Sequence, residues 1–275
     1  MPAAIVLAGL VLAVLAAPLV EAALGVDAVT VDLIGRLEPP AAPHLLGTDE
    51  LGRDVLARLL RGGQISLLVG IATALLAAAI GTLVGLVAGF RGGTADALLM
   101  RLTDGVIALP LLPLLIVLAA VDPGKLGLAP TPELAVARIV LLVALVGWTT
   151  TARVVRAVVL SLRERAFVEA AVAAGAGPAR ILAVHILPHC AAPILVATTL
   201  SVGNVILLES ALSFLGLGVP PPLASWGSLL TGAQELIWTA PQLALYPGLL
   251  IFATVVSVNL LGDRLQRMFD PQGAR

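Results

Sequence analysis

The chain has 275 residues, of which 59% are hydrophobic and 12% charged, and its formal net charge is −1. This composition excludes an ordinary soluble globular domain and predicts a polytopic membrane protein. The single cysteine, Cys190, excludes an intrachain disulfide and a cysteine-based metal cluster.

Six apolar stretches approach the roughly 20 residues that a helix needs to cross a bilayer. The alternation typical of barrel strands is missing, so we predict an all-α membrane protein with six transmembrane helices. The first is expected to be an uncleaved helix rather than a signal peptide, because no Lys or Arg precedes Arg36. The expected spans lie near Ala3–Leu24, Ile65–Phe90, Ala95–Val121, Leu134–Leu160, Cys190–Leu217 and Pro241–Leu261.

Basic residues are unevenly divided between the two sets of loops that six crossings would create. The richer set includes both chain termini, and the bias favours a cytoplasmic location for that set. Its ten arginines are Arg91, Arg101, Arg153, Arg156, Arg163, Arg165, Arg180, Arg264, Arg267 and Arg275, against Arg36, Arg53, Arg58, Arg61, Lys125 and Arg138 in the other set.

A charged segment between the first two spans, Gly47–Gly63, has apolar residues at helical spacing. Asp54 lies four residues before Arg58, a spacing that favours an ion pair on a helix. We therefore predict an extracytoplasmic helix that lies flat at the membrane surface and leads into the second span. Its apolar face would consist of Leu51, Val55, Leu56, Leu59 and Leu60.

The sequence of the loop between the fourth and fifth spans, at about 161–189, predicts two short helices held outside the lipid. An alanine-rich first helix is expected to end at two glycines, and a second helix to begin and end at prolines. A slim, jointed pair suits insertion into a cleft on another protein, and a solvated loop is the alternative. The residues concerned are Glu169, Ala170, Ala171, Gly175, Gly177, Pro178, Leu187 and Pro188, with Arg163, Arg165 and Arg180 as flanking charges.

Polar residues interrupt the fifth span. A carboxylate at membrane depth is costly and usually faces the bundle interior or an aqueous path, so Glu209 either lines a pathway or bonds to a neighbouring helix. An intramembrane protease is less well supported, because no aspartate pair or Ser/His pair is present there. The candidates for a translocation pathway are Ser201, Asn204, Glu209 and Ser213.

The segment Gly218–Ala240 joins the last two spans and contains Trp226 and Trp238 but no Lys or Arg. Tryptophan favours the membrane interface, so the segment is expected to dip partly into the outer leaflet. A plain outer loop is the alternative, and a gate or a contact for an external protein is a further one.

Motifs for enzyme chemistry are missing from the sequence. A phosphate-binding loop of the GxxxxGK[ST] type needs a lysine, and the only lysine, Lys125, has no Ser or Thr after it. His185 and His189 are spaced i, i+4 but lack the glutamate of HExxH, and Pro188 lies between them. No GxSxG sequence occurs. We expect no catalytic residue, no metal site and no ATP site in this chain.

Four sequence blocks, taken in order, resemble permease subunits of bacterial ABC importers. The order Glu169-Ala170-Ala171, three residues, Gly175, then Leu187-Pro188 resembles the EAA motif, the loop that docks onto ATP-hydrolysing subunits. His185 departs from it, because many such loops carry isoleucine there. The blocks HLLGTDELGRDVLARLL, SLRERAFVEAA, ESALSFLGLGVPPPLASWG and NLLGDRLQRMFDP are similar to the second permease of dipeptide, oligopeptide and nickel importers.

The resemblance implies the type I ABC importer permease fold in a bacterial inner membrane. It implies a second permease subunit as heterodimer partner, two cytoplasmic ATP-binding subunits that carry ATP and Mg²⁺, an extracytoplasmic substrate-binding protein, and no nucleic acid. This chain would bind no cofactor of its own. The coupling role is implied for Arg163, Arg165, Glu169, Ala170, Ala171, Gly175, Gly177, Arg180, Leu187 and Pro188.

Two regions are expected along the chain. Residues 1–62 would hold the first transmembrane helix and the interfacial helix, and residues 63–275 the core permease domain with its coupling loop. The implied cargo is a dipeptide or oligopeptide, with nickel or another small solute as the alternative. A stand-alone secondary transporter or an intramembrane enzyme is a further alternative.

Overall fold

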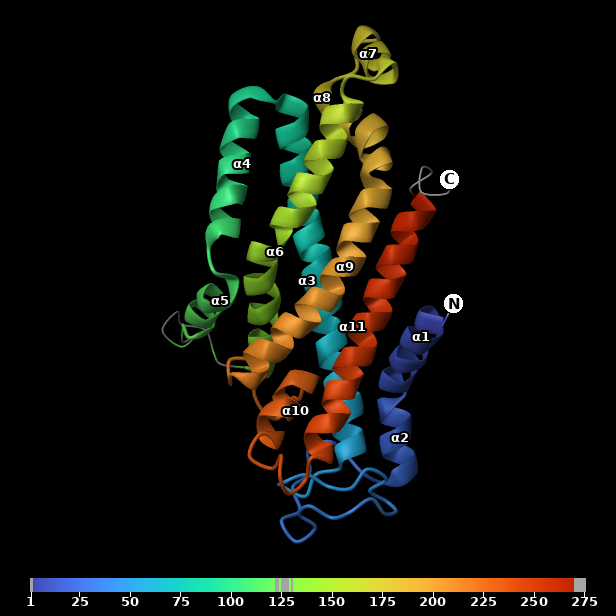
Figure 1. Ribbon diagram of the computed structural model, residues 1–275, viewed down its shortest axis with the longest axis vertical. Coiled ribbons are helices and arrows are strands. Elements are labelled where there is room, and N and C mark those ends of the chain that lie inside the picture. Colours follow the sequence, from blue (N-terminus) through green and yellow to red (C-terminus); the bar gives the residue numbers. More distant parts are fainter. Residues whose placement is uncertain (1, 122–123, 125–128, 130, 270–275) are drawn as a thin grey trace.

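A computed structural model describes residues 2–121, 124, 129 and 131–269, which form an elongated bundle of helices (Figure 1). Lys125, the lysine discussed above, lies outside the described residues. The elements are α1 (Pro2–Leu15), α2 (Ala17–Leu24), α3 (Val55–Arg91), α4 (Gly93–Ala108), α5 (Leu111–Ala119), α6 (Pro132–Leu162), α7 (Ala166–Ala173), α8 (Pro178–Arg180), the π-helical segment η2 (Ile181–Ile186), α9 (Leu187–Phe214), α10 (Trp226–Ala233) and α11 (Gln242–Phe269).

Four helical stretches are long and apolar enough to cross a membrane: α3, α6, the continuous run Pro178–Phe214, and α11. The other two expected spans are bent. α1 and α2 meet at 54°, and α4 and α5 meet at 84°. By length and composition, the described residues therefore offer four candidate spans, or up to six if each bent pair is one span.

Prolines lie at both bends. Pro18 is in the first turn of α2, and Pro110 separates α4 from α5. A proline removes one backbone donor, and it also pushes the residue before it away from the α-helical region. Leu109 has the extended backbone that this rule favours, with ψ at 136°. The expected span Ala95–Val121 is therefore two helices with a sharp turn between them.

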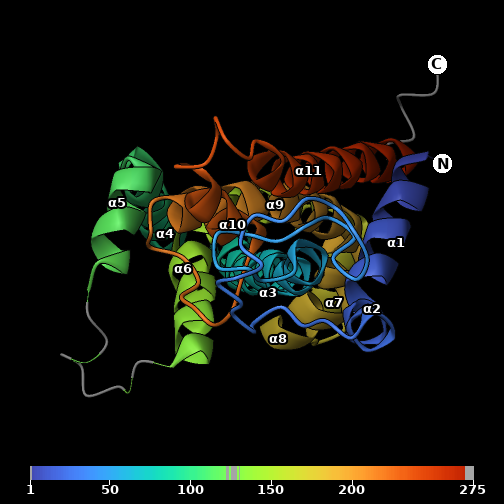
Figure 2. The same ribbon diagram turned by 90° about the horizontal axis from the view of Figure 1, so that it is seen from below.

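α3 runs through the middle of the bundle (Figure 2) and packs closely against α6. Glycines at every fourth position of α3 make the close approach possible. A Cβ atom built on Gly81 would lie 2.5 Å from the carbonyl oxygen of Trp148, and one on Gly85 would lie 2.6 Å from that of Ala152. Small residues at this spacing let membrane helices approach backbone to backbone.

The helix expected over Gly47–Gly63 has a different form. Residues 47–54 form turns, and residues 55–63 are the first turns of α3, which continues without a break to Arg91. Asp54 is the reason for the boundary, because its side chain accepts a hydrogen bond from the backbone N–H of Ala57 at 2.7 Å and caps α3. The prediction of a separate interfacial helix was wrong.

Pro188 was expected to close the second helix of the 161–189 loop, and that expectation was also wrong. The chain remains helical from Pro178 to Phe214. Within η2 the hydrogen bonds reach one residue farther back than in an α-helix: the N–H of Leu187 donates to the carbonyl of Leu182. This wider turn accommodates the proline ring, which clashes with the carbonyl four residues earlier in a regular α-helix.

Trp226 was expected near the membrane interface but lies inside the bundle at 0% exposure. Its indole N–H donates to the carbonyl of Leu59 at 2.9 Å, so α10 is fastened to α3. Trp238 is 93% exposed. The two tryptophans of this segment therefore have opposite environments, and α10 packs against α3, α9 and α11 rather than forming a plain loop.

Candidate functional site

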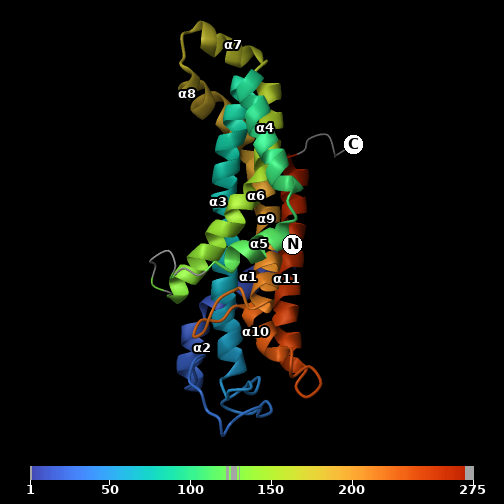
Figure 3. The ribbon, with the colours of Figure 1, turned by 90° about the vertical axis from the view of Figure 1, so that its left-hand side faces the viewer.

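The segment that contains α7 and α8 projects beyond one end of the bundle (Figures 1 and 3). The junction between α3 and α4 and the far end of α11 point to the same end, whereas α10 and residues 26–54 lie at the opposite end. The loops expected to share a compartment are thus at one end of the molecule.

α7 is held to the bundle by one buried side chain. Val168 is 3% exposed and packs in a cluster with Ile181, Ile186 and Cys190 from the following helical run. Most of the segment's remaining side chains are exposed to solvent. Of the residues predicted to couple, the exposed ones are Arg165, Glu169, Ala170, Gly175, Gly177, Arg180, Leu187 and Pro188, while Ala171 and Arg163 are half-buried.

Gly175 ends α7 in a left-handed conformation, with φ at 79°. The N–H of Ala176 donates to the carbonyl of Ala171 at 3.0 Å, and the N–H of Gly175 donates to that of Val172 at 2.9 Å. This pair of bonds is the Schellman motif, which favours glycine at this position. Gly177 has an ordinary φ of −70°, so only one of the two glycines is needed for its backbone angle.

The three arginines of the segment lie in different surroundings. Arg163 donates to the carbonyl of Gly89 at 3.2 Å and therefore caps the end of α3. It also lies 3.6 Å from Glu164. Arg165 and Arg180 have no ion-pair partner in the part of the chain that the structure describes. Two of the three charges thus remain available at the surface.

An aromatic contact that the sequence did not reveal connects α7 to α9. The rings of Phe167 and His189 are stacked, with centroids 5.2 Å apart and planes at 18°. The Nδ1 atom of His189 lies 2.8 Å from the carbonyl oxygen of His185, which fixes the ring. His189 also lines the large cavity described next, so one side chain contacts both the projecting segment and that cavity.

A cavity of about 1250 Å³ lies between α4, α6, α9 and α11. Ser201 and Asn204, two of the four pathway candidates, line it together with Thr150 and Thr151. Most of the other lining side chains are apolar. The cavity can therefore accept a large guest and offers it a few hydroxyl and amide groups.

Glu209 and Ser213, the other two candidates, lie elsewhere. Glu209 is 0% exposed, and it accepts hydrogen bonds from Ser213 at 2.6 Å and from Ser66 at 3.3 Å. The Ser66 hydroxyl in turn accepts from the backbone N–H of Trp226 at 3.1 Å. This buried cluster joins α9 to α3 and α10, which is the structural alternative raised for Glu209 above.

Ion pairs also connect α4 to α6 near the end where α7 projects. Arg156 bonds to Asp96 at 2.5 and 2.6 Å, and Arg153 bonds to Asp104 at 2.6 Å. These pairs use two of the arginines that the charge count had placed in the cytoplasm. No group of three or more His, Cys, Asp or Glu side chains among the described residues could hold a metal ion.

Comparisons with known proteins agree on one family. The family described as "Binding-protein-dependent transport system inner membrane component" matches residues 81–273. The di/tripeptide transport system permease protein DppC of Pseudomonas aeruginosa (strain UCBPP-PA14) is 41% identical over 237 residues, which is 86% of this chain and 75% of the relative. A Brucella suis protein whose name describes a peptide permease is 41% identical over 244 residues, 88% of this chain and 78% of the relative.

Solved structures give the same fold at lower identity. Inward-facing conformations of the MetNI methionine ABC transporter match with a TM-score of 0.60 at 19% identity, covering 77% of this chain and 95% of that one. A second crystal form matches with a TM-score of 0.59 at 18% identity, covering 76% and 95%.

Proposed function

Because the chain belongs to the family of inner membrane components of binding-protein-dependent transport systems, we propose that it works as the peptide permease of an ABC importer, carrying dipeptides or oligopeptides. The observation that carries the proposal is 41% identity, over most of the chain, to a di/tripeptide permease. Each bent helix pair is one crossing in this proposal, which gives six spans and the type I importer fold.

Cytoplasmic ATPase subunits are proposed to bind the projecting segment, with Glu169–Ala171 and Gly175 at the centre of the contact. The exposure of Glu169, Ala170 and Gly175 and the single buried anchor, Val168, support this role. Arg165 and Arg180 are the charges proposed to meet the ATPase surface. Arg163 has a different proposed role, because its bond to Gly89 holds the segment to the end of α3.

A second permease subunit is proposed to cover α9. Only 17% of an apolar 18-residue stretch of the Pro178–Phe214 run is buried, against 39 to 44% for such stretches of α3, α6 and α11. The uncovered part of α9 includes Ser201 and Asn204, which line the 1250 Å³ cavity. In this proposal the cavity is one half of the translocation pathway, and the partner supplies the other half.

In this proposal the partner ATPase subunits, and not this chain, bind and hydrolyse the nucleotide. ATP and Mg²⁺ would be held by the two ATPase subunits, whose closure moves α7 and tilts α9. Driving a two-state protein from 1:99 to 99:1 requires about 5.5 kcal/mol of differential binding. The Schellman cap, the Val168 anchor and the Phe167–His189 stack are the contacts in this chain through which such a load would pass.

Uptake by purified components tests the function. Proteoliposomes with both permeases and both ATPases, and with the binding protein on the outside, should accumulate labelled dialanine only with ATP inside. Omitting this chain should abolish uptake. Uptake of Ni²⁺ in place of dialanine would favour the alternative cargo. Dialanine uptake without the ATPases would indicate a secondary transporter, and ATP turnover by this chain alone would contradict the proposal.

The orientation is a separate proposal: α7 and both termini face the cytoplasm of a bacterial inner membrane. The excess of arginines at the α7 end supports it. Ala174 and Ile34 are exposed at opposite ends of the bundle. A membrane-impermeant maleimide added to intact cells should label Ile34→Cys and leave Ala174→Cys unlabelled. The reverse pattern would overturn the orientation.

A further inference from the structure

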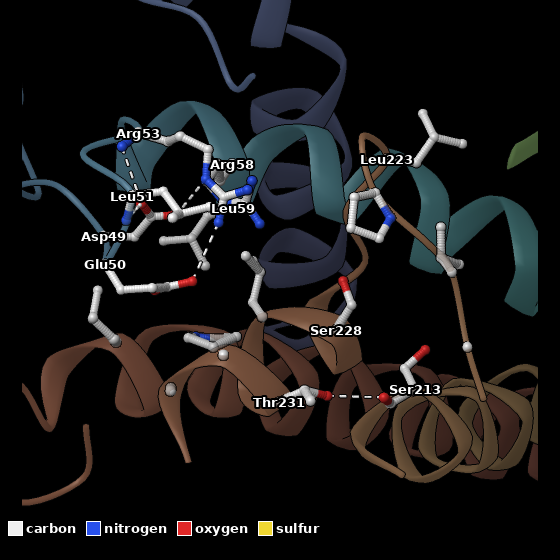
Figure 4. Close-up of a pocket in the computed structure, with 18 of the residues that line it drawn as sticks. Asp49, Glu50, Leu51, Arg53, Arg58, Leu59, Ser213, Leu223, Ser228 and Thr231 are labelled. Carbon is white, nitrogen blue, oxygen red and sulfur yellow. Dashed lines mark hydrogen bonds and ion pairs between the residues drawn. The ribbon is translucent and has the colours of Figure 1, made fainter. Parts of the chain in front are cut away.

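A second cavity, of about 420 Å³, lies at the end of the bundle opposite α7. Figure 4 shows its walls, which come from the turns before α3, the first turns of α3, α10, and the chain after α9. Its volume falls within the range of roughly 300–1000 Å³ that is usual for small-molecule sites. In the orientation proposed above, it faces the side from which substrate arrives.

Four charged side chains line this cavity, and their formal charges cancel. Asp49 lies at the centre: its Oδ2 atom accepts from Nε of Arg53 at 2.8 Å and lies 3.1 Å from Nε of Arg58. Glu50 accepts from Arg53 at 3.3 Å. The exposed fractions of the side chains are 8% for Asp49, 12% for Arg53, 11% for Arg58 and 30% for Glu50.

Two of these four groups retain unused hydrogen-bonding capacity. Nη1 of Arg58 donates to the carbonyl of Ala28 at 3.4 Å, and Nη2 has no partner among the described residues. The contact of Nε with Asp49 also lacks hydrogen-bond geometry. A guanidinium carries five N–H donors, so Arg58 can still bind an anion. Glu50 has a single long bond and can still accept from a cation.

The rest of the lining suits an organic guest. Thr231 donates its hydroxyl to the carbonyl of Ser213 at 2.8 Å, and Ser228 donates to that of Ser225 at 3.0 Å. Thr231 and Ser228 both line the cavity, whose other walls include apolar side chains such as Leu229. A guest with separated charges and small side chains fits this lining better than a bare ion does.

Charge balance narrows the guest further. A simple anion would meet Asp49 and Glu50, and a bare cation would meet Arg53 and Arg58, so each would gain from one pair and lose to the other. A zwitterion can place each charge beside its opposite. Charge-assisted hydrogen bonds in a partly buried site are stronger than neutral ones, which makes the two ends of such a guest its main anchors.

We propose that this cavity is an entry subsite for short zwitterionic peptides, with the guest's carboxylate on Arg58 and its ammonium group on Glu50. The inference rests on the proposed peptide function and adds a site distinct from the 1250 Å³ cavity. Gly232 of α10 lies beside Glu50, since a Cβ atom built there would be 3.1 Å from the carboxylate. α10 therefore forms one wall of the subsite.

The test is equilibrium binding of dialanine to the complete complex in nanodiscs. Binding is measured by saturation-transfer NMR, which detects weak ligands. Glu50→Gln should weaken dialanine binding roughly tenfold or more, the usual effect of losing a charged hydrogen bond. It should not weaken binding of N-acetyl-dialanine, which has no ammonium group. Dialanine amide should bind the unaltered complex less tightly than dialanine does, because it lacks the carboxylate for Arg58.

The control variant is Glu38→Gln, an exposed carboxylate in the same extramembrane segment that does not line the cavity. Equal weakening of dialanine and N-acetyl-dialanine by Glu50→Gln would show a structural role and overturn the subsite. Unchanged dialanine binding, or the same loss in Glu38→Gln, would also overturn it. ATP-driven dialanine uptake by the same complex separates the two proposals: if uptake persists while the subsite fails, the peptide function stands.

Discussion

Replacing Gly175 by alanine should weaken binding of the ATPase subunits without unfolding the permease. No heavy atom lies within 4 Å of a Cβ atom built at Gly175, so the substitution causes no clash. Its effect comes from φ at 79°, where an L-residue costs roughly 1–2 kcal/mol. If the cap must be intact for docking, binding should fall by a factor of roughly 5–30.

The matched control is Gly177→Ala, two residues away. Gly177 is also exposed and has open space around it, but its φ of −70° suits any residue. Gly175→Asn should lose less than Gly175→Ala, because asparagine tolerates the left-handed region better. The measurement is a titration of the detergent-solubilised permease pair with the labelled ATPase subunits. Equal affinity for the Gly175→Ala and Gly177→Ala complexes would refute the reasoning.

Three other substitutions probe the scaffold and the coupling path. Gly85→Ala places a Cβ atom 2.6 Å from the carbonyl oxygen of Ala152 and should lower the free energy of unfolding by about 1–3 kcal/mol. Gly105→Ala is the control, because the space around Gly105 is open and its free energy of unfolding should not fall. Thermal unfolding in detergent compares the two variants. Glu209→Leu should destabilise by about 1–3 kcal/mol, because two buried hydroxyls lose their acceptor, and in the same assay Glu209→Gln should lose less. Phe167→Ala removes a ring stack worth about 0.5–1.5 kcal/mol. It should lower the amount of peptide carried per ATP hydrolysed while leaving ATPase binding unchanged. An unchanged ratio of peptide carried to ATP hydrolysed would exclude a role for the stack in coupling.

The lengths of the apolar stretches predicted which segments form long helices, but they did not predict where those helices bend. The stretch near Ala95–Val121 is long enough for one span, yet α4 and α5 meet at 84°. Pro110 carries the signal for that bend, because the residue before a proline avoids the helical region. At Pro188 the sequence predicted a helix end, but a π-helical turn lets the helix continue past this proline. The presence of a proline therefore does not by itself distinguish a bend from a wider helical turn.

The projecting segment could be predicted in outline because its signals are local. Alanines favour a helix, and a glycine after them favours a left-handed cap, so α7 and its end follow from nearby residues. The different roles of Gly175 and Gly177 do not follow from composition. The bond from Arg163 to Gly89 also could not be predicted, because it joins residues that are far apart in the sequence.

The pathway candidates could have been divided by helical geometry alone. At 3.6 residues per turn, the mean direction of Ser201 and Asn204 differs from that of Glu209 and Ser213 by about 130°. One helix face therefore cannot present all four residues to a single cavity. The structure puts the first pair in the large cavity and the second pair in the buried cluster. What the sequence could not supply is which neighbour each face meets.

This division limits how α9 can move. Rotation of α9 about its own axis would carry Glu209 away from Ser66, and Ser66 also holds the backbone of Trp226. Such a rotation would leave Glu209 with only the bond from Ser213 of its own helix and would leave the Ser66 hydroxyl without its acceptor, which is costly in a low-dielectric interior. Tilting about the Glu209 cluster keeps those bonds while displacing the other end of the run, where Phe167 contacts His189. A tilt can thus change the large cavity at Ser201 and Asn204 with the buried cluster as its pivot, whereas a rotation would break the pivot first.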